Sequence, residues 1–300
     1  MEKVNVFSPS AVRELLKKRG LKPNKGLGQN FLVDRNVAGK IVDAAGLGPD
    51  DLVVEIGPGL GALTVCAAKR AARVIAVELD AGLASALREI AGAAPNVDVV
   101  VGDALEVDFD RLAGEASGGI FGKGGKKYAV LGNLPYYITT PLLMRLLTEG
   151  FNISVLVVMV QLEVAQRLAA VPGGKEYGAL SVAVQYYTEP AFVFRVPARL
   201  FYPAPAVDSA VMRLAVRDTP AVRVKDEKSF FRVVRAAFAH RRKTLLNSLL
   251  ASGLGGDKNY WHEVLVKAGI DPKRRGETLS IEELARLADV WSKTLLPKQC

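Results

Sequence analysis

The segment LVVEIGPGLG, residues 52–61, contains the pattern from which the fold can be inferred. Its first five residues are mostly apolar and β-branched, which is typical of a parallel strand buried on both faces. Glycines follow at positions 57, 59 and 61, and they permit a tight turn whose backbone can approach a ligand closely. A helical pattern then covers residues 62–69. The segment predicts a strand, a ligand-binding turn and a helix.

Further short apolar runs have the same character, and helical patterns separate them. The predicted strands lie at residues 74–77, 97–101, 128–131 and 155–160. The predicted helices lie at residues 81–90 and 141–147, the second with Thr140 as its cap and Pro141 at its first position. This alternation predicts an α/β fold with a doubly wound parallel sheet. Residues 192–196 and 210–216 alternate in polarity, and we expect them to pair antiparallel at one edge.

The apolar period becomes helical after residue 218. Helical patterns cover residues 230–238, 243–250, 260–268 and 281–291. We therefore expect one domain at residues 1–218, which includes an N-terminal extension at 1–40, and a small all-helical domain at 219–300. In the extension, Ser8 and Pro9 predict the start of a short helix. Residues 114–127, rich in glycine and lysine, predict a flexible surface loop.

The net charge of +9 is distributed unevenly along the chain. Residues 1–40 carry a net charge of +6, residues 41–218 carry −4 and residues 219–300 carry +7. Basic ends around a mildly acidic centre are expected if the ends bind a polyanion while the centre performs chemistry. Ordinary solvated surface charge explains the same composition equally well.

Several classes of protein are disfavoured by composition. The longest apolar run, residues 155–160, is far shorter than the roughly 20 residues that span a bilayer, and no secretory signal is expected. Cys66 and Cys300 occur in no metal-binding or C-x-x-C spacing, and His240 and His262 are the only histidines. We expect no membrane segment, disulfide framework or metal site, and a reducing cytoplasm as the location.

Two acidic residues follow the second and third predicted strands. Glu78 can accept hydrogen bonds from both hydroxyls of a ribose, and Asp103 can accept one from an adenine amino group. Either acid alone is more often a helix cap or a surface charge. Together with Gly57 and Gly59, at successive strand ends, they favour a cofactor that contains a nucleoside.

A dinucleotide cofactor fits this turn poorly. The spacing G-x-G-x-G differs from the G-x-G-x-x-G of dinucleotide sites, and Pro58 removes one backbone donor from the turn. No proton donor is placed for hydride chemistry. A dehydrogenase is therefore disfavoured.

The tetrapeptide Asn-Leu-Pro-Tyr, residues 133–136, directly follows the predicted strand at 128–131. The Asn133 amide oxygen and the Leu134 carbonyl can accept from the two N–H groups of one planar amine, while the Tyr136 ring covers its π-face. Pro135 would stiffen the segment. A planar amine needs positioning more than deprotonation, so these residues indicate a methyl acceptor site.

Several motifs in this order resemble a known family. The turn, the acid at 78 and the tetrapeptide resemble the class I methyltransferases that use S-adenosyl-L-methionine. More narrowly, the chain is similar to the bacterial small-subunit (16S) ribosomal RNA adenine N6,N6-dimethyltransferases. The motifs that carry this resemblance are GQNFL at 28–32, EIGPGL at 55–60, GNLPY at 132–136, FYPAPAVDSAV at 201–211 and FAHRRKTLLNSL at 238–249.

The resemblance implies a Rossmann-like sheet with a helical C-terminal domain. It also implies dimethylation of the N6 amino groups of two adjacent adenosines near the 3′ end of small-subunit rRNA, with S-adenosyl-L-homocysteine as the second product. The partners would be this rRNA and the assembling small subunit, and the protein would be a monomer that acts in ribosome biogenesis.

Residue roles follow from the same resemblance. It assigns Asn30 and Leu32 to the cofactor, in addition to Gly57, Gly59, Glu78, Asp103 and Asn133. Phe201 would stack with Tyr136 on a flipped adenine, although packing in the core would also explain either aromatic residue.

Two basic clusters are candidates for contact with RNA. The first consists of Lys17, Lys18, Arg19, Lys22 and Lys25, and the second of Arg232, Arg235, Arg241, Arg242 and Lys243. Lysine and arginine bind the phosphate backbone of folded RNA. The alternative for the second cluster is the solvated face of an amphipathic helix.

Two other functions remain open at this point. A large-subunit rRNA adenine methyltransferase of the macrolide-resistance type would share the same cofactor site. A non-catalytic assembly factor could retain the site as well, although the intact segment at 133–136 argues against loss of catalysis.

Overall fold

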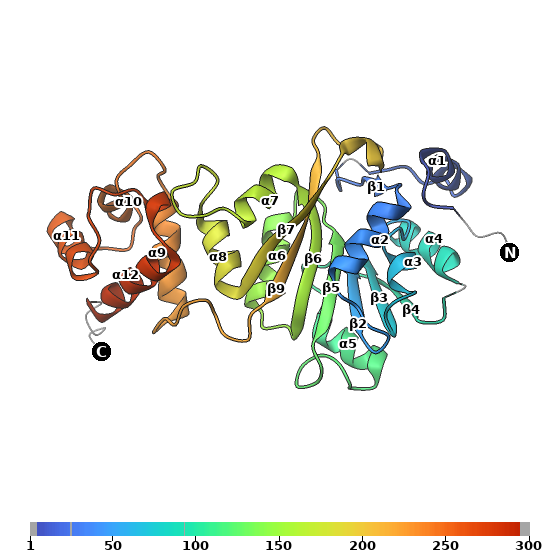
Figure 1. The fold of residues 1–300 in the computed structure, drawn as a ribbon, viewed down its shortest axis with the longest axis horizontal. Helices are drawn as coiled ribbons and strands as arrows, with labels where there is room; N and C mark the ends of the chain where they lie inside the picture. Colours follow the sequence, from blue (N-terminus) through green and yellow to red (C-terminus); the bar gives the residue numbers. More distant parts are fainter. Residues whose placement is uncertain (1–4, 25, 93, 295–300) are drawn as a thin grey trace. The chain divides into compact units, whose positions relative to one another are not determined.

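The computed structural model describes residues 5–24, 26–92 and 94–294, which form two compact units (Figure 1). Unit 1 consists of Met1–Ala165 and Glu189–Val216, and unit 2 consists of Gln166–Thr188 and Arg217–Cys300. The predicted boundaries differ from this division in residues 166–188. These residues belong with the C-terminal helices because Val182 and Tyr186 are buried in their hydrophobic core.

Unit 1 is built on a seven-stranded sheet in the order β4-β3-β2-β5-β6-β9-β7. Strands β4, β3, β2, β5 and β6 are parallel, whereas β9 pairs antiparallel with β6. The strands are β2 (Leu52–Ile56), β3 (Arg73–Glu78), β4 (Val97–Val101), β5 (Tyr128–Asn133), β6 (Ile153–Gln161), β7 (Thr188–Val196) and β9 (Ser209–Val216). The predicted parallel strands are confirmed, and β7 lies beside β9 at the edge.

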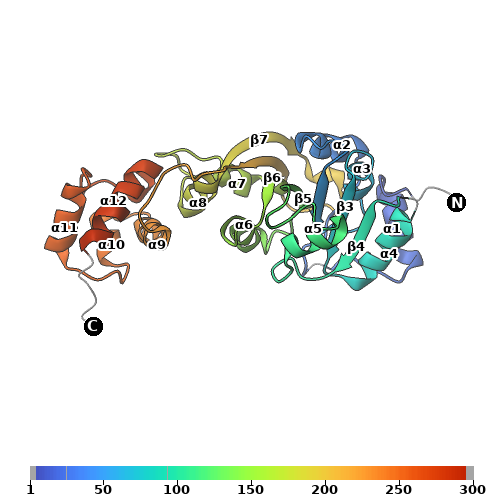
Figure 2. The same ribbon diagram turned by 90° about the horizontal axis from the view of Figure 1, so that it is seen from below.

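Helices cover both faces of this sheet, as Figure 2 shows. On one side, α2 (Arg35–Ala44) and α3 (Thr64–Ala67) bury Ile41 and Cys66 against Val53, Leu131 and Met159 of the sheet. The helices on the other side are α5 (Phe109–Ser117) and α6 (Thr139–Thr148). The remaining helices of the sheet region are α4 (Ala81–Ala91) and α7 (Leu162–Leu168).

An N-terminal helix, α1 (Pro9–Lys18), begins where the sequence predicts it. The Ser8 hydroxyl accepts a hydrogen bond from the Ala11 N–H at 3.2 Å and so caps the helix. Leu15 and Leu16 pack in a cluster with Phe31, while Arg19 forms an ion pair with Glu89 of α4 at 2.7 Å. The chain then reaches β1 (Phe31–Leu32), which pairs antiparallel with β8 (Phe201–Tyr202). Strand β8 directly follows the short 3₁₀ helix Ala198–Leu200.

The glycine- and lysine-rich loop is shorter and better anchored than the sequence predicts. Residues 114–117 belong to α5, whose last residue is Ser117. The Asn152 side-chain amide donates to the Gly122 carbonyl at 2.8 Å and to the Gly125 carbonyl at 2.9 Å. These bonds hold the turn between Phe121 and Lys126, which form an isolated β-bridge.

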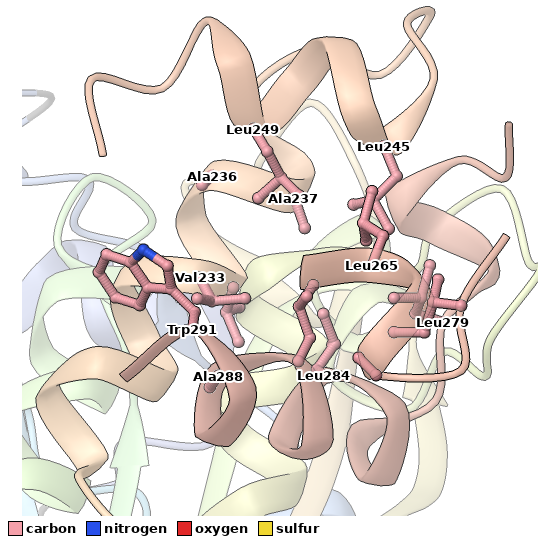
Figure 3. Packing of buried hydrophobic residues seen from close by; sticks show 14 of the residues in the cluster. Val233, Ala236, Ala237, Leu245, Leu249, Leu265, Leu279, Leu284, Ala288 and Trp291 are labelled. Atoms are coloured by element: carbon pink, nitrogen blue, oxygen red, sulfur yellow. The ribbon is translucent and has the colours of Figure 1, made fainter. Parts of the chain in front are cut away.

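Unit 2 is a helical bundle around one hydrophobic core (Figure 3). Its helices are α8 (Ala179–Tyr187), α9 (Glu227–Phe238), α10 (Leu245–Leu250), α11 (Lys258–Lys267) and α12 (Ile281–Thr294), with a 3₁₀ turn at Gly276–Thr278. Val233, Leu249 and Leu284 are fully buried, and the rings of Trp261 and Trp291 stack with centroids 6.2 Å apart. The predicted helical period of this region is confirmed.

Within the described ranges, no helix is both long and apolar enough to cross a membrane.

Candidate active site

A cavity lies at the carboxyl ends of the parallel strands of unit 1. The strand order reverses between β2 and β5, and ligands of open α/β sheets bind at such a reversal. The cavity is lined by the turn after β2, by the ends of β3 and β5, and by residues 102–104 after β4. Residues 27–32 from the N-terminal segment complete the lining.

The glycine turn after β2 forms the floor of this cavity. Gly57, Gly59 and Gly61 have positive φ angles of 67°, 56° and 84°, which side chains other than glycine rarely adopt. A Cβ on Gly59 would lie 3.0 Å from the Phe31 ring, and one on Gly61 would lie 2.5 Å from Leu87. The turn thus depends on glycine at these positions, and Gly57 and Gly59 line the cavity beside Pro58 and Leu60.

Glu78, the last residue of β3, is held by backbone donors. Its carboxylate accepts from the Gly59 N–H at 2.9 Å and from the Asp80 N–H at 3.0 Å. The side chain is only 6% exposed, and burial raises the pKa of this carboxyl, an effect that these two hydrogen bonds oppose. Both oxygens retain further lone pairs, so Glu78 can also accept from a ligand.

A second acid, Glu55 of β2, also lines the cavity but is 1% exposed. The Thr64 hydroxyl donates to its carboxylate at 2.6 Å. Burial raises the pKa of Glu55 to about 7, although the Thr64 hydrogen bond opposes the shift and the nearby Glu78 charge adds to it. Glu55 is the first residue of the EIGPGL motif, but no role for its side chain was inferred from the sequence.

Asp103 lies in the turn that follows β4 and lines the cavity. One of its carboxylate oxygens accepts from the Leu105 N–H at 2.8 Å. The same turn is braced by Arg145 of α6, whose guanidinium donates to the carbonyls of Ala104 and Val107, each at 2.8 Å.

Sequence reasoning missed Arg145. Its guanidinium also lies over the rings of Phe109 and Phe151, 5.6 Å and 5.1 Å from their centroids, and pairs with Glu149 at 3.0 Å. The sequence feature that could have pointed to Arg145 is that it is the single arginine within the otherwise apolar run at 142–147.

Asn133 is the last residue of β5, and its amide is fixed in the cavity wall. The Asn133 Nδ2 group donates to the Asn30 carbonyl at 2.9 Å. Because the amide nitrogen has this partner, the side-chain oxygen is the acceptor that Asn133 can offer to a ligand. Asn30 in turn donates its own side-chain amide to the Gly28 carbonyl at 2.9 Å. The Leu134 N–H donates to Met159 O at 3.1 Å, which ties the segment to β6.

The turn after Leu134 leads directly into α6. The Pro135 carbonyl accepts from the Ile138 N–H at 3.2 Å and from the Thr139 hydroxyl at 2.9 Å. The prediction that Thr140 caps this helix is wrong, because the helix begins at Thr139 with Ile138 at the cap position and no side-chain cap.

Tyr136 lines the cavity, and its hydroxyl forms a 2.9 Å hydrogen bond with the Ser209 hydroxyl. Burial raises the pKa of Tyr136. The neighbouring Tyr137 also lines the cavity but is 51% exposed. The two adjacent tyrosines therefore differ in how firmly they are held.

Most of the predicted cofactor and catalytic residues are brought together here. Those that line the cavity are Asn30, Leu32, Gly57, Gly59, Glu78, Asp103, Asn133, Leu134, Pro135 and Tyr136. Asn30 and Leu32 reach it because β1 pairs with β8, with Leu32 opposite Phe201.

Phe201 is the exception among these predictions. It is 3% exposed, packs in the cluster that contains Leu32 and Val211, and is not among the residues that line the cavity. Because Phe201 is buried in this cluster, the arrangement supports core packing instead of the predicted stacking on a base.

The predicted RNA-binding residues lie on both units. In unit 1, Lys17, Lys18 and Lys22 are exposed, Arg19 is paired with Glu89, and Lys25 lies outside the described residues.

In unit 2, Arg232, Arg235, Arg242 and Lys243 are exposed. The Arg232 guanidinium lies 4.9 Å from the centroid of the Trp291 ring. Arg241 pairs with Glu277 at 3.2 Å and donates to the Lys175 carbonyl, so its charge is partly engaged within the unit.

No group of histidine, cysteine, aspartate and glutamate side chains in the described part of the chain could hold a metal ion.

Comparison with known proteins gives concordant matches. The family model described as ribosomal RNA adenine dimethylase matches residues 20–287. The chain is 64% identical over 284 residues to ribosomal RNA small subunit methyltransferase A of Pelotomaculum thermopropionicum, covering 95% of this chain and 96% of that protein. It is 56% identical over 287 residues to the protein of the same name from Moorella thermoacetica, covering 95% and 98%.

Solved structures show the same fold. The 23S rRNA methyltransferase ErmE superposes with a TM-score of 0.65 at 30% identity, covering 88% of this chain and all of that one. A dimethyladenosine transferase from Plasmodium falciparum superposes with a TM-score of 0.69 at 24% identity, covering 84% and 94%. The predicted Rossmann-like sheet with C-terminal helices is confirmed.

Proposed function

Because the chain belongs to the ribosomal RNA adenine dimethylase family, we propose that it transfers methyl groups from S-adenosyl-L-methionine to adenine N6 atoms of small-subunit rRNA. The observation that carries this proposal is the fixed orientation of Asn133. Its amide nitrogen is bound to the Asn30 carbonyl at 2.9 Å, so its oxygen remains as an acceptor at the cavity wall beside Tyr136. An acceptor next to an aromatic ring suits an exocyclic amine of a nucleobase.

The cavity suits S-adenosyl-L-methionine in its donor half, which we define as Gly57–Gly61, Glu78 and Asp103. The glycine turn would accommodate the amino acid portion, since Gly57 and Gly59 line the cavity and carry no side chain that would occupy it. The Glu78 carboxylate would accept from the ribose hydroxyls and Asp103 from the adenine amine. This cofactor supplies a methyl group on a positively charged sulfur.

The acceptor half, residues 133–136, would orient the target amine. Adenine N6 is a weak nucleophile because its lone pair is delocalised into the ring. Hydrogen bonds from N6 to the Asn133 oxygen and the Leu134 carbonyl would favour a pyramidal nitrogen whose lone pair is available. These acceptors stabilise the positive charge that develops on nitrogen, so they help most in the transition state.

The Asn133 amide is not a base, so it cannot remove a proton from the attacking amine. Its contribution is position and electrostatics. Tyr136 would stack on the base, a contact that contributes on the order of 1–3 kcal/mol. The hydroxyl of Tyr136 is held by Ser209, so the ring is fixed before the base arrives.

The choice of small-subunit rRNA is supported by the names of the curated relatives and by the exposed basic residues. Relatives from several bacteria are called ribosomal RNA small subunit methyltransferase A. Lys22, Arg232, Arg235, Arg242 and Lys243 are exposed and could contact phosphates. We propose that the protein acts as a monomer on the assembling small subunit.

Binding of such a particle should weaken steeply as salt rises, because each neutralised phosphate releases counterions. Filter binding between about 50 and 200 mM salt would measure the slope. The double variant Arg235→Ala/Arg242→Ala should lower the slope, whereas Arg223→Ala, at an exposed arginine that was not predicted to bind RNA, serves as the control. Salt-insensitive binding would contradict a phosphate-binding surface.

The direct test of the function is Asn133→Ala. Turnover on undermethylated small-subunit particles, followed with labelled S-adenosyl-L-methionine, should fall at least about 100-fold, as expected for the loss of a transition-state acceptor. Calorimetry with S-adenosyl-L-homocysteine should show at most a severalfold change in affinity. Asn36→Ala, on the exposed surface of α2, is the matched control.

The two particle types separate the proposed substrate from its main alternative. Similarity to the 23S rRNA methyltransferase ErmE makes large-subunit particles the appropriate comparison. Label confined to small-subunit rRNA, mapped as N6,N6-dimethyladenosine, supports the proposal. Label found in large-subunit rRNA would show that this rRNA, and not small-subunit rRNA, is the substrate. Binding without turnover on either particle would favour a non-catalytic assembly role.

A further inference from the structure

Ser209 is a fully buried polar residue at the start of an apolar strand. Strand β9 (Ser209–Val216) has the sequence SAVMRLAV, and its first four residues are buried. Ser209 lies opposite Gln161 of β6 and has no solvent-exposed surface. Burying a hydroxyl costs free energy unless the hydroxyl finds a partner. Packing of the strand alone therefore does not account for a serine at this buried position.

Its partner is the hydroxyl of Tyr136, at 2.9 Å. Strand β6 lies between β5, which carries the tyrosine segment, and β9, which carries the serine. The hydrogen bond thus spans the carboxyl end of β6 and joins residues 73 positions apart in the chain.

Backbone hydrogen bonds anchor the segment on either side of Tyr136. Leu134 N–H binds Met159 O at 3.1 Å, and Ile138 N–H binds Pro135 O at 3.2 Å. Between these points, the ring is oriented through its hydroxyl. Tyr137 provides an internal contrast, because it lines the same cavity but remains 51% exposed.

We propose that Ser209 is a positioning residue for methyl transfer, which holds the Tyr136 ring in the plane that the target base must meet. This inference rests on the proposed function. The fixed hydroxyl reduces the rotational freedom of the ring before the base binds, so less entropy is lost when the base stacks. Ser209 itself touches neither donor nor acceptor, and its effect passes through the tyrosine.

A double-mutant cycle isolates this role. The variants are Ser209→Ala, Tyr136→Phe and the two combined, each assayed on small-subunit particles at saturating S-adenosyl-L-methionine. Each single change should lower kcat/KM for the particle about three- to tenfold, as expected for one hydrogen bond. The combined variant should be no worse than Tyr136→Phe alone, because the bond is already absent.

Two further measurements separate positioning from a general loss of structure. Affinity for S-adenosyl-L-homocysteine should stay within about twofold of the wild type in all three variants, since an unchanged contact leaves ΔG of binding unchanged. The control Ser154→Ala removes a hydroxyl of the same sheet that donates to the Tyr128 carbonyl at 3.2 Å. This control should leave kcat/KM unchanged, whatever its effect on Tm.

The outcomes that overturn the inference are distinct. Additive losses in the cycle, or a Ser209→Ala enzyme as active as Ser154→Ala, contradict the role of Ser209 while leaving the methyltransferase intact. A wild-type protein that binds S-adenosyl-L-homocysteine but methylates no ribosomal particle contradicts the proposed function, and the role of Ser209 with it.

Discussion

The two halves of the cavity are built in different ways. The donor half is formed by a glycine turn and by two acids at the carboxyl ends of successive parallel strands, Glu78 within β3 and Asp103 just after β4, so each residue is placed by its own strand. In the acceptor half, Asn133 is tethered to Asn30 and Tyr136 to Ser209, and the partners are 103 and 73 positions apart in the chain. Local backbone geometry thus builds the first half, whereas contacts between distant segments build the second.

The difference has a physical origin. A nucleoside cofactor is recognised by backbone and carboxylate groups that a strand end and a tight turn provide wherever they occur. A flipped base must instead be held in one plane at one distance, which requires side chains fixed by second contacts. Changes in the donor half should therefore reduce cofactor binding, and changes in the acceptor half should reduce turnover.

Glu78→Ala should have the largest effect on the donor half. Two ribose hydroxyls would lose a charged acceptor, so affinity for S-adenosyl-L-homocysteine should fall about 100-fold or more. Calorimetry measures this directly, while filter binding of the small-subunit particle should remain near the wild-type level. Unchanged cofactor affinity would contradict the assignment of Glu78 to the ribose. A loss of turnover without a loss of cofactor affinity would contradict the assignment of separate roles to the donor and acceptor halves.

Glu55→Gln tests the buried charge beneath the donor half. The folded-state pKa of about 7 lies above the ordinary glutamate pKa of 4.5, so between these values the folded protein holds a proton that the unfolded chain has released. The stabilising contribution is present below the unfolded pKa and is lost as pH rises through the folded pKa. Between about pH 5 and 8 the wild type should therefore lose about 2 kcal/mol of stability relative to Glu55→Gln.

Denaturant titrations of both proteins across this pH range measure the difference. The wild type and the variant should have similar free energies of unfolding near pH 5, and the variant should be the more stable near pH 8. Parallel pH profiles would mean that Glu55 stays ionised in the fold.

Arg145→Met should have the smallest effect. The methionine retains an apolar stem beside Phe109 and Phe151, but the carbonyls of Ala104 and Val107 lose their donor. Looser positioning of Asp103 should weaken cofactor affinity about threefold, with Arg145→Lys intermediate. Arg111→Met, which removes an exposed pair with Glu115, is the control and should bind the cofactor normally. An equal effect in both variants would show that Arg145 does not act through the Asp103 turn.

Prediction from sequence succeeded where chemistry and periodicity are local. The strands of the parallel sheet, the glycine turn at 57–61, and the acids Glu78 and Asp103 follow from short patterns, and the structure brings these residues to one cavity. The resemblance added Asn30 and Leu32, which no local pattern would have selected. For Phe201 the sequence left both stacking on a base and core packing open, because its motif does not reveal that pairing with β1 buries its ring.

The sequence by itself determined the family, the alternation of strands and helices, and the donor half, because a turn or a strand end depends on neighbouring residues. Only the tertiary structure decided that Asn30 orients Asn133, that Ser209 holds Tyr136, that Arg145 braces the turn at Asp103, and that residues 166–188 join the C-terminal helices. These features depend on which distant segments become neighbours, and hydrogen bonds and packing act only once the fold has brought the partners within a few ångströms.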